Sequence, residues 1–198
     1  MRIVLASQSP SRASILRGAG VEPTIAPAHV DERAIESSLE GAFPAEIVCA
    51  LATAKAEAIA PEYPDDVVVG GDSMLLLNGE LQGKPHTEAA TVERWRAQAG
   101  RTAELITGHC VLFGGQRFVE ASRTTVHFAE ATEADIAAYA RTGEPLECAG
   151  AFTLEAIGGW FIDRIEGDPS SVIGLSLPVL RRALYSFDLS VSSFWQSR

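Results

Sequence analysis

The sequence has few cysteines, and no motif that would pair them or let them bind zinc. Cys49, Cys110 and Cys148 are widely spaced, and no CxxC occurs. An odd number of cysteines at such spacings predicts neither a disulfide framework nor a zinc site. Free cysteines are typical of reducing compartments, so we expect a cytoplasmic location.

Long hydrophobic runs and an excess of basic residues are also missing. No stretch approaches the roughly 20 uninterrupted apolar residues of a membrane span. The apolar run near residue 1 is too short for a signal peptide and predicts a first strand instead. The 26 acidic residues outnumber the 16 basic ones, giving a net charge of −10. Nucleic-acid-binding proteins normally carry a basic patch, so we expect neither polymeric nucleic acid nor a membrane as a partner.

Several common enzyme signatures are absent as well. There is no Walker P-loop and no GxGxxG, which argues against a P-loop NTPase and a Rossmann dehydrogenase. The four histidines are scattered, with no HxH or HExxH spacing, so a histidine-based zinc site is not predicted. Cys148 has no histidine nearby in the sequence, which argues against a cysteine nucleophile.

The elements that are present alternate between helix and strand. With 46% apolar and 21% charged residues, the 198-residue chain can build a sizeable core. Helices are predicted over residues 10–20, 44–60, 86–100, 132–143 and 170–187, and extended segments over 22–32 and 150–167. Strands are predicted over 2–6 and 65–77, and two long strands on either side of Gly114-Gly115 within 103–131. We expect an α/β fold with a mixed, twisted β-sheet flanked by helices. We also expect a single domain over residues 1–198, and the pattern leaves open two lobes around a central cleft.

The stretch "LASQSPSRASIL" places polar residues where a strand gives way to a helix. Ser9 is a good N-cap, and Pro10 suits the first helical turn. A helix N-terminus flanked by Ser7 and Ser9 attracts anions, phosphate in particular, and Arg12 adds a fixed positive charge. Taken alone, the pattern favours a simpler interpretation, an ordinary capped helix with a solvent-exposed arginine.

The stretch "GGDSM" places Asp72 within a strongly apolar strand. A buried carboxylate is costly unless it is paired, hydrogen-bonded or metal-bound, although an aspartate at a strand end can also cap a turn. Asn78-Gly79 predicts a tight hairpin after this strand. A bulge at Gly83 would bring Lys84 to the face of Asp72. Such a pair is either structural, or holds a metal or activates a water while the lysine neutralises phosphate.

These segments together resemble the Maf family of nucleoside triphosphate pyrophosphatases. The order "LASQSPSR", "VDE", "ATAKA", "GGDS…NGELQGKP", "TGHCVL" and "EPLECAGAF…GGWFIDRIEGDPSSVIGLSLPVL" covers nearly the whole chain. The resemblance implies hydrolysis of a nucleoside triphosphate to the monophosphate and pyrophosphate, with a divalent metal, in the cytoplasm. It also implies a fold shared with the ITP pyrophosphatases, a house-cleaning role against non-canonical nucleotides, and a link to septum formation and division arrest.

The resemblance assigns the phosphate contacts to five residues. Ser7, Ser9 and Arg12 would cradle the triphosphate. Lys55 and Lys84 would offset the charge that develops on the phosphates, Lys84 as part of the catalytic machinery.

The resemblance also assigns a metal site and a base. Glu32 and Asp72 would hold one Mg²⁺ or Mn²⁺, the kind of ion that oxygen ligands suit. Asp72 would in addition orient or deprotonate the attacking water. Alone, the acidic residues of "VDER" and the lysine of "TAKAE" more often belong to a solvated surface.

Four positions depart from patterns found in the family. Ala13 stands where a second arginine is frequent, Ser73 stands for threonine, and Cys148 and Glu155 replace the lysine and glutamine of the pyrimidine-preferring branch. A carboxylate only accepts hydrogen bonds, and guanine offers two adjacent donors where uracil offers one. If Glu155 faces the base, a guanine-like edge is preferred, cationic 7-methylguanine above all. The 7-methyl-GTP branch of the family likewise has Cys-Ala-Gly followed by a glutamate.

Two further points stay open at the level of sequence. The alternative function is a non-catalytic nucleotide sensor that regulates cell division through a partner. The family suggests a homodimer, and the tail with Phe194 and Trp195 either offers a contact surface or folds back onto its own domain.

Overall fold

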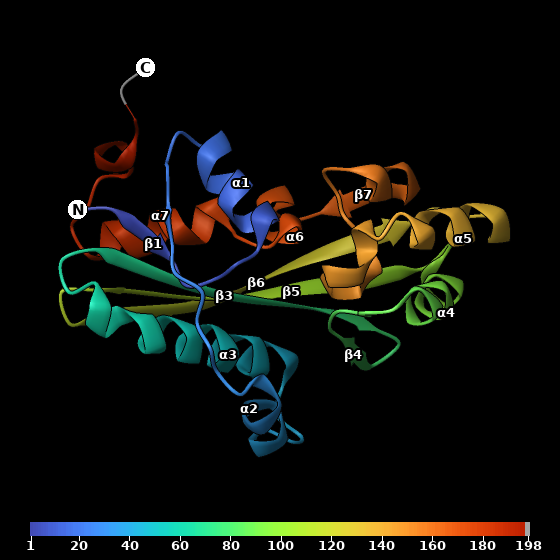
Figure 1. The fold of residues 1–198 in the computed structure, drawn as a ribbon, viewed down its shortest axis with the longest axis horizontal. Coiled ribbons are helices and arrows are strands. Elements are labelled where there is room, and N and C mark those ends of the chain that lie inside the picture. The colour runs from blue at the N-terminus through green and yellow to red at the C-terminus, as the bar shows by residue number, and fades with distance from the viewer. Residues whose placement is uncertain (197–198) are drawn as a thin grey trace. The chain divides into compact units, whose positions relative to one another are not determined.

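The computed structural model describes residues 1–196, which form two compact units. Unit 1 comprises Met1–Asp72, Thr107–Ser122 and the chain from Gly174 onward, and unit 2 comprises Ser73–Ile106 and Arg123–Ile173. The strands are β1 (Ile3–Leu5), β2 (Thr24–Ile25), β3 (Val67–Leu77), β4 (Glu80–Gln82), β5 (Thr102–Phe113), β6 (Gln116–Phe128) and β7 (Ile162–Glu166). Strands β3, β5 and β6 contribute to both units (Figure 1).

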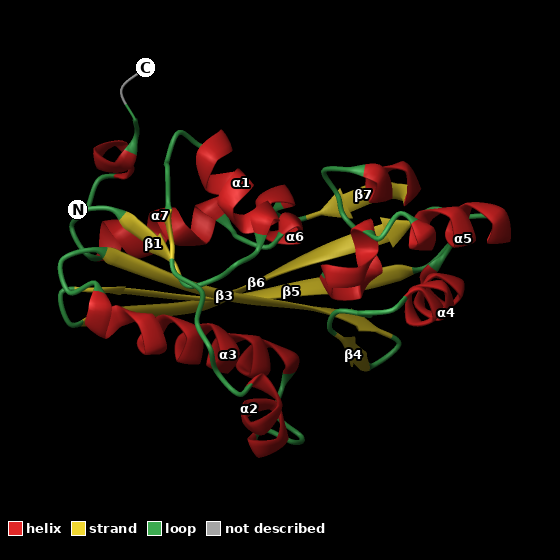
Figure 2. Cartoon of the chain, in the orientation of Figure 1, coloured by secondary structure: helices red, strands yellow, loops and turns green. Residues whose placement is uncertain are grey.

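The sheet is mixed, as the sequence predicts. The strand order is β2-β1-β3-β5-β6-β7, and β4 pairs with β3. β1 pairs with β2 and β3 in parallel, whereas β3–β4 and β6–β7 are antiparallel. Helices flank the strands (Figure 2), so the expectation of an α/β protein with a mixed sheet is confirmed.

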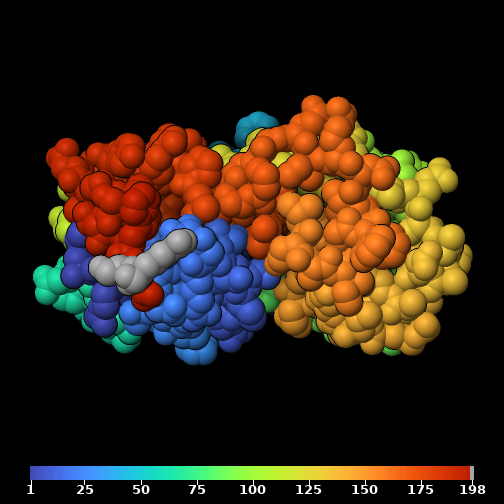
Figure 3. All heavy atoms as spheres, turned by 90° about the horizontal axis from the view of Figure 1, so that it is seen from above, coloured from blue at the N-terminus to red at the C-terminus, as the bar shows by residue number. Residues whose placement is uncertain are grey.

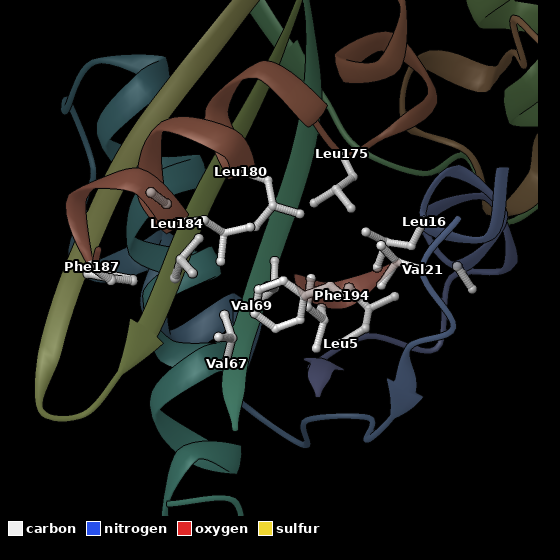
Figure 4. Packing of buried hydrophobic residues seen from close by; sticks show 14 residues of the cluster. Leu5, Leu16, Val21, Val67, Val69, Leu175, Leu180, Leu184, Phe187 and Phe194 are labelled. Atoms are coloured by element: carbon white, nitrogen blue, oxygen red, sulfur yellow. The ribbon is translucent and has the colours of Figure 1, made fainter. Parts of the chain in front are cut away.

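In unit 1, helices cover both faces of the sheet. They are α1 (Pro10–Gly18), α2 (Glu32–Ser38), α3 (Pro44–Ile59) and α7 (Leu177–Ser186), with short 3₁₀ turns η1 (Ala60–Glu62) and η5 (Val191–Phe194). Alternate residues of a strand point to opposite faces. Leu5 and Val69 therefore pack with α1 and α7 in one apolar cluster (Figure 4), while Val68 packs with α3 in another.

Helix α3 lies against the strands at two glycines. A Cβ built on Gly70 would lie 2.1 Å from the Ala52 carbonyl oxygen, and one on Gly108 would lie 2.4 Å from the Val48 carbonyl. Neither glycine has a positive φ, so space and not backbone conformation requires them. These contacts set the height of α3 above β3 and β5.

Unit 2 packs around Trp95. Its helices are α4 (Glu88–Gln98), α5 (Glu133–Arg141) and α6 (Pro169–Ile173), with 3₁₀ turns η2 (Glu144–Glu147), η3 (Ala149–Ala151) and η4 (Ile157–Phe161). The fully buried Trp95 ring meets Phe128, Tyr139 and Phe161 edge-on at centroid distances of 5.5 to 5.6 Å. Its indole nitrogen donates to the Ala151 carbonyl at 2.7 Å, which ties α4 to η3.

Four sequence-based expectations need correction. Residues 32–38 form α2 where no helix is predicted, because none of its side chains is buried and no apolar period marks it. The predicted helix 170–187 is two helices, since Ser176 caps α7 and accepts from the Val179 N–H at 3.1 Å. The extended segment 150–167 contains η3 and η4 before β7 begins.

The fourth correction concerns the β3–β4 hairpin. Its turn is as predicted, with positive φ at Asn78 and Gly79. However, β4 ends at Gln82, so there is no bulge at Gly83 and no ladder pairing for Lys84. The Gly83 carbonyl instead accepts from the Arg94 guanidinium and from the Gly150 N–H.

The described part of the C-terminal tail folds back onto unit 1. Phe194 is buried in the same cluster as Leu16, and the Gln196 N–H donates to the Gly20 carbonyl at 2.8 Å. Figure 3 shows this C-terminal segment in red against the blue N-terminal segment. Trp195 remains 58% exposed. A homodimer through this tail remains a prediction.

Candidate functional site

The start of α1 draws three of the predicted residues together. Ser9 caps the helix, and its hydroxyl accepts from the Arg12 N–H at 3.4 Å. The Ser7 hydroxyl accepts from the Ser9 N–H at 3.2 Å and from the Arg12 guanidinium at 3.1 Å. This arrangement makes a helix N-terminus ringed by hydroxyls and one fixed cation.

Arg12 is half-buried, contrary to the simpler interpretation of a solvent-exposed arginine. Its Nε donates to the Gly174 carbonyl at 2.8 Å, which anchors the guanidinium to the start of the segment before α7. Burial lowers the pKa of Arg12, and the nearby carboxylates of Asp72 and Glu32 oppose this shift. Arg12 therefore lies within electrostatic reach of the predicted acidic residues.

Asp72 is 8% exposed, and its partner is Lys55 of α3. Asp72 follows Gly70 by two residues, so both face α3. Because α3 contacts β3 at Gly70, Lys55 lies close enough to place its Nζ 2.7 Å from the Asp72 Oδ1. The ion pair with Lys55 thus compensates for the burial of Asp72. The predicted hairpin placed Lys84 beside Asp72 and did not indicate this partner.

Lys55 also reaches a second carboxylate. Its Nζ lies 2.9 Å from the Oε1 of Glu32, the first residue of α2. Asp31 caps this helix by accepting from the Ala34 N–H at 3.0 Å, which fixes where Glu32 begins it. One ammonium group therefore holds Glu32 and Asp72 together.

Glu36 is a neighbour of this group that sequence reasoning missed. Glu36 is exposed, but partial desolvation, with the nearby carboxylates of Asp72 and Glu32, raises its pKa. The signal was available, because Glu32 and Glu36 are four residues apart and such residues share a helix face. Unit 1 thus gathers three carboxylates, Lys55 and Arg12.

The two other predicted residues belong to unit 2. Lys84 is exposed, and its Nζ lies 3.2 Å from the Glu147 Oε2. The other oxygen of Glu147 lies 3.1 Å from the His86 Nδ1. The hydrogen bond with His86 lowers the pKa of Glu147, burial opposes the shift, and Lys84 reinforces it. Lys84 therefore has a carboxylate partner within its own unit.

Glu155 lies in the exposed segment between η3 and η4. Its Oε2 accepts from the Leu154 N–H at 3.1 Å, within its own loop. Thr153 and Gly158, on either side of this segment, are buried. Glu155 is therefore an exposed carboxylate on a loop whose two ends, at Thr153 and Gly158, are buried.

Two surface hollows of unit 1, of about 410 and 310 Å³, lie elsewhere. The larger is lined by residues such as Glu57, Tyr63 and Arg117, and the smaller is apolar and includes Trp195. Neither includes a predicted site residue. The candidate site is therefore identified by its charged groups and not by a cavity.

Cys148 provides a test of the expectation that no cysteine acts as a nucleophile. Burial, with the nearby Glu155 and Glu144, raises the pKa of Cys148 to about 11. At pH 8 we expect iodoacetamide to label Cys148 roughly 100-fold more slowly than an unperturbed thiol, because the thiolate is the reactive form. Labelling followed by peptide mass spectrometry should show the rate rising up to about pH 11. The urea-unfolded chain is the control, and equal rates in the folded and unfolded chain at pH 8 would contradict the prediction.

No helix in the described part of the chain combines the length and the apolar character needed to cross a bilayer. Within residues 1–196, no three His, Cys, Asp or Glu side chains are arranged to hold a metal by themselves.

Comparison with known proteins gives a family. The family model described as "Maf-like protein" matches residues 2–187. The chain therefore belongs to the Maf-like protein family, and the resemblance seen in the sequence is confirmed.

Three similar bacterial proteins carry the same name. A protein of Corynebacterium aurimucosum named "Nucleoside triphosphate pyrophosphatase" is 86% identical over 195 residues, which cover 98% of each chain. Proteins of the same name from Corynebacterium diphtheriae and Nocardia farcinica are 71% and 54% identical, and the matches cover 100% and 98% of this chain and 100% and 96% of theirs. A solved structure of the Staphylococcus aureus Ham1 protein matches with a TM-score of 0.43 and 17% identity, over 66% of this chain and 73% of that one. A likeness at that level carries no functional argument.

Proposed function

We propose that this Maf-like protein is a nucleoside triphosphate pyrophosphatase that acts in the cytoplasm. The observation that carries the proposal is the grouping in unit 1 of Lys55 with Glu32 and Asp72, within electrostatic reach of Arg12 at the start of α1. A relative that is 86% identical bears this name, which supports the same assignment.

Phosphate binding is assigned to the start of α1. The first N–H groups of a helix lack intrahelical partners and favour an anion. Ser7, Ser9 and Arg12 are already fixed around this end by mutual hydrogen bonds, so little ordering remains to be done on binding. Lys55 and Lys84 are assigned to offset negative charge on the phosphates as the reaction proceeds.

Asp72 is assigned as the proton acceptor. Water attacks the α-phosphorus, the bond from that phosphorus to the α–β bridging oxygen breaks, and pyrophosphate leaves with the bond's electron pair. The proton of the water passes to the Asp72 carboxylate. Lys55, at 2.7 Å, fixes the orientation of that carboxylate toward α3.

The donor set suits a hard divalent cation. Glu32 and Asp72 supply carboxylate oxygens at one position, where Lys55 already gathers them around a positive charge. Mg²⁺ is typically bound through one or two carboxylates together with water and substrate phosphates. Mg²⁺ or Mn²⁺ held by Glu32 and Asp72 would polarise the phosphate oxygens.

The base preference is assigned to Glu155. A carboxylate pairs best with two adjacent donors, so guanine, and 7-methylguanine above all, is the proposed base. The Glu155→Gln variant should lose this preference, because an amide offers a donor as well as an acceptor. We expect the kcat/KM ratio of GTP to UTP to fall about tenfold. Parallel assays with 7-methyl-GTP and dTTP check the trend, and an unchanged ranking of bases would exclude Glu155 from base recognition.

The proposed function is tested by product analysis. Purified protein is incubated with Mg²⁺ or Mn²⁺ and UTP, dTTP, CTP, GTP, 7-methyl-GTP or ITP, and pyrophosphate and monophosphate are quantified. Formation of both, with loss after EDTA treatment and recovery on adding the metal back, supports a metal-dependent pyrophosphatase. Release of inorganic phosphate instead would indicate attack at another phosphorus. Tight nucleotide binding without any turnover would favour the alternative, a nucleotide-sensing regulator of division.

A further inference from the structure

We propose that Glu144 is a positioning residue that sets base selectivity by holding the loop that carries Glu155. This inference rests on the proposed role of Glu155. Glu144 is half-buried and directly precedes Pro145, and nothing in this sequence position indicates such a function.

The carboxylate of Glu144 connects the two ends of the loop formed by residues 153–158. Its Oε1 accepts from the Gly158 N–H at 3.0 Å and from the Thr153 hydroxyl. Its Oε2 accepts from the Ile157 N–H at 3.2 Å. One side chain therefore fastens both ends of the segment 153–158, and Glu155 lies near its middle.

The same carboxylate ties the loop to α5. Its Oε1 also accepts from the Tyr139 hydroxyl at 3.0 Å, and that hydroxyl in turn accepts from the Thr153 N–H at 3.2 Å. The Tyr139 ring packs on Trp95 in the core of unit 2. These contacts link the loop that carries Glu155 to the aromatic core of unit 2 around Trp95.

The two ends of this loop, at Thr153 and Gly158, are closely packed against each other and against Tyr139. A Cβ built on Gly158 would lie 2.5 Å from both the Thr153 carbonyl oxygen and the Tyr139 hydroxyl. The Gly158 N–H also donates to the Thr153 hydroxyl at 3.2 Å. Such close packing transmits a change at Glu144 to the loop, because it cannot be absorbed locally.

The donors around Glu144 match an ionised carboxylate. Burial raises its pKa, but the hydrogen bonds from Thr153, Gly158, Ile157 and Tyr139 outweigh burial, and the net shift is downward. All four groups donate, and a carboxylate is an acceptor at both oxygens. A glutamine of the same shape would turn an NH₂ donor toward at least one of these donors and so release part of the loop.

The test compares Glu144→Gln, Glu155→Gln and the double variant. We expect Glu144→Gln to lower the GTP-to-UTP ratio of kcat/KM about tenfold, mainly through KM. In the Glu155→Gln background the same change should leave the ratio unaltered, because Glu144 acts through Glu155. Glu133→Gln is the matched control, since Glu133 is a unit 2 carboxylate that pairs with Arg96 and not with this loop. Its ratio should equal that of the wild type.

Two additional measurements separate positioning from loss of fold. Hydrogen exchange of the Ile157 and Gly158 amides should accelerate in Glu144→Gln while the melting temperature reports the global fold. If that variant fails to fold, Tyr139→Phe removes one donor at nearly constant volume and should shift the ratio in the same direction.

The outcomes distinguish this inference from the proposed function. An unchanged ratio in a folded Glu144→Gln with faster amide exchange overturns the inference, as does an equal loss of selectivity in the Glu155→Gln background. No turnover of any nucleotide by the wild type refutes the proposed activity alone. The inference about Glu144 is then tested by the ratio of the GTP and UTP dissociation constants in the same variants. A wild type that binds both nucleotides equally well overturns this inference as well.

Discussion

Replacing Asp72 by asparagine is expected to lower kcat by about 10³-fold with any nucleotide that the wild type hydrolyses. The amide cannot take up the proton of the attacking water, and it also weakens the interaction with Lys55 at 2.7 Å. The nucleotide should still bind, because the phosphate contacts at the start of α1 are unaltered. The measurement is steady-state release of pyrophosphate, with binding followed separately by calorimetry.

Asp66→Asn is the control for this change. Asp66 is as buried as Asp72, belongs to the same unit, and pairs with a cation, accepting from the Arg2 N–H at 2.7 Å and from its guanidinium at 2.6 Å. The hydrogen bond from Arg2 lowers the pKa of Asp66, with burial opposing it. Asp66 therefore stabilises the fold at neutral pH, and this contribution is lost as the pH falls through its folded-state pKa.

The Asp66→Asn protein should thus melt at a lower temperature at pH 7 while keeping its kcat. The difference in melting temperature from the wild type should narrow as the pH falls through the lowered pKa of Asp66, because Asp66 itself then becomes protonated. A similar loss of kcat in both variants would mean that Asp72 acts through stability or general electrostatics and not as a base.

The features that the sequence predicts well are local. The Ser9 cap, the Asn78-Gly79 turn and the apolar strands near residues 2–6 and 65–77 depend on contacts within a few residues, and the structure contains them all. The family resemblance added the site residues, since each motif alone is compatible with an ordinary capped helix or a solvated surface.

The features that sequence analysis missed depend on docking between distant elements. The pairing of Asp72 with Lys55 follows from the height of α3 above β3, which is set by contacts between backbones. Helix α2 leaves no apolar pattern because it buries none of its side chains. The prediction for Lys84 assumed that a ladder continues past Gly83, whereas that carbonyl is bonded to α4 and η3. A hydrophobic pattern contains none of this information.

The second large effect is expected at Gly70, where a single added methyl group should separate the two halves of the unit 1 site. The Cβ of Gly70→Ala would lie 2.1 Å from the Ala52 carbonyl oxygen and 2.9 Å from the Ala56 nitrogen, both in the backbone of α3. Neither atom can move without the helix, so α3 must rise from β3. We expect a loss of about 4 kcal/mol in the free energy of unfolding and a fall of about 10 °C in melting temperature.

Catalysis should suffer beyond this loss of stability. Lys55 is carried by α3 and Asp72 by β3, so lifting the helix lengthens the ion pair that orients the proposed base. A displacement of about 1 Å at a catalytic group can cost 10²-fold in rate, and we expect kcat to fall by about that factor at temperatures where the variant is still folded.

Gly71→Ala is the matched control for stability, because it makes the same substitution at the next residue on the opposite face. Its Cβ would lie 3.5 Å from the Arg12 Nε and 3.7 Å from the Gly108 carbonyl oxygen, which are ordinary contact distances. It should unfold within about 1 kcal/mol of the wild type. Thermal and denaturant unfolding of both variants measure this difference in stability. Equal stability of the two would mean that α3 can adjust at Gly70, and that the distance between Lys55 and Asp72 is set by something other than this backbone contact.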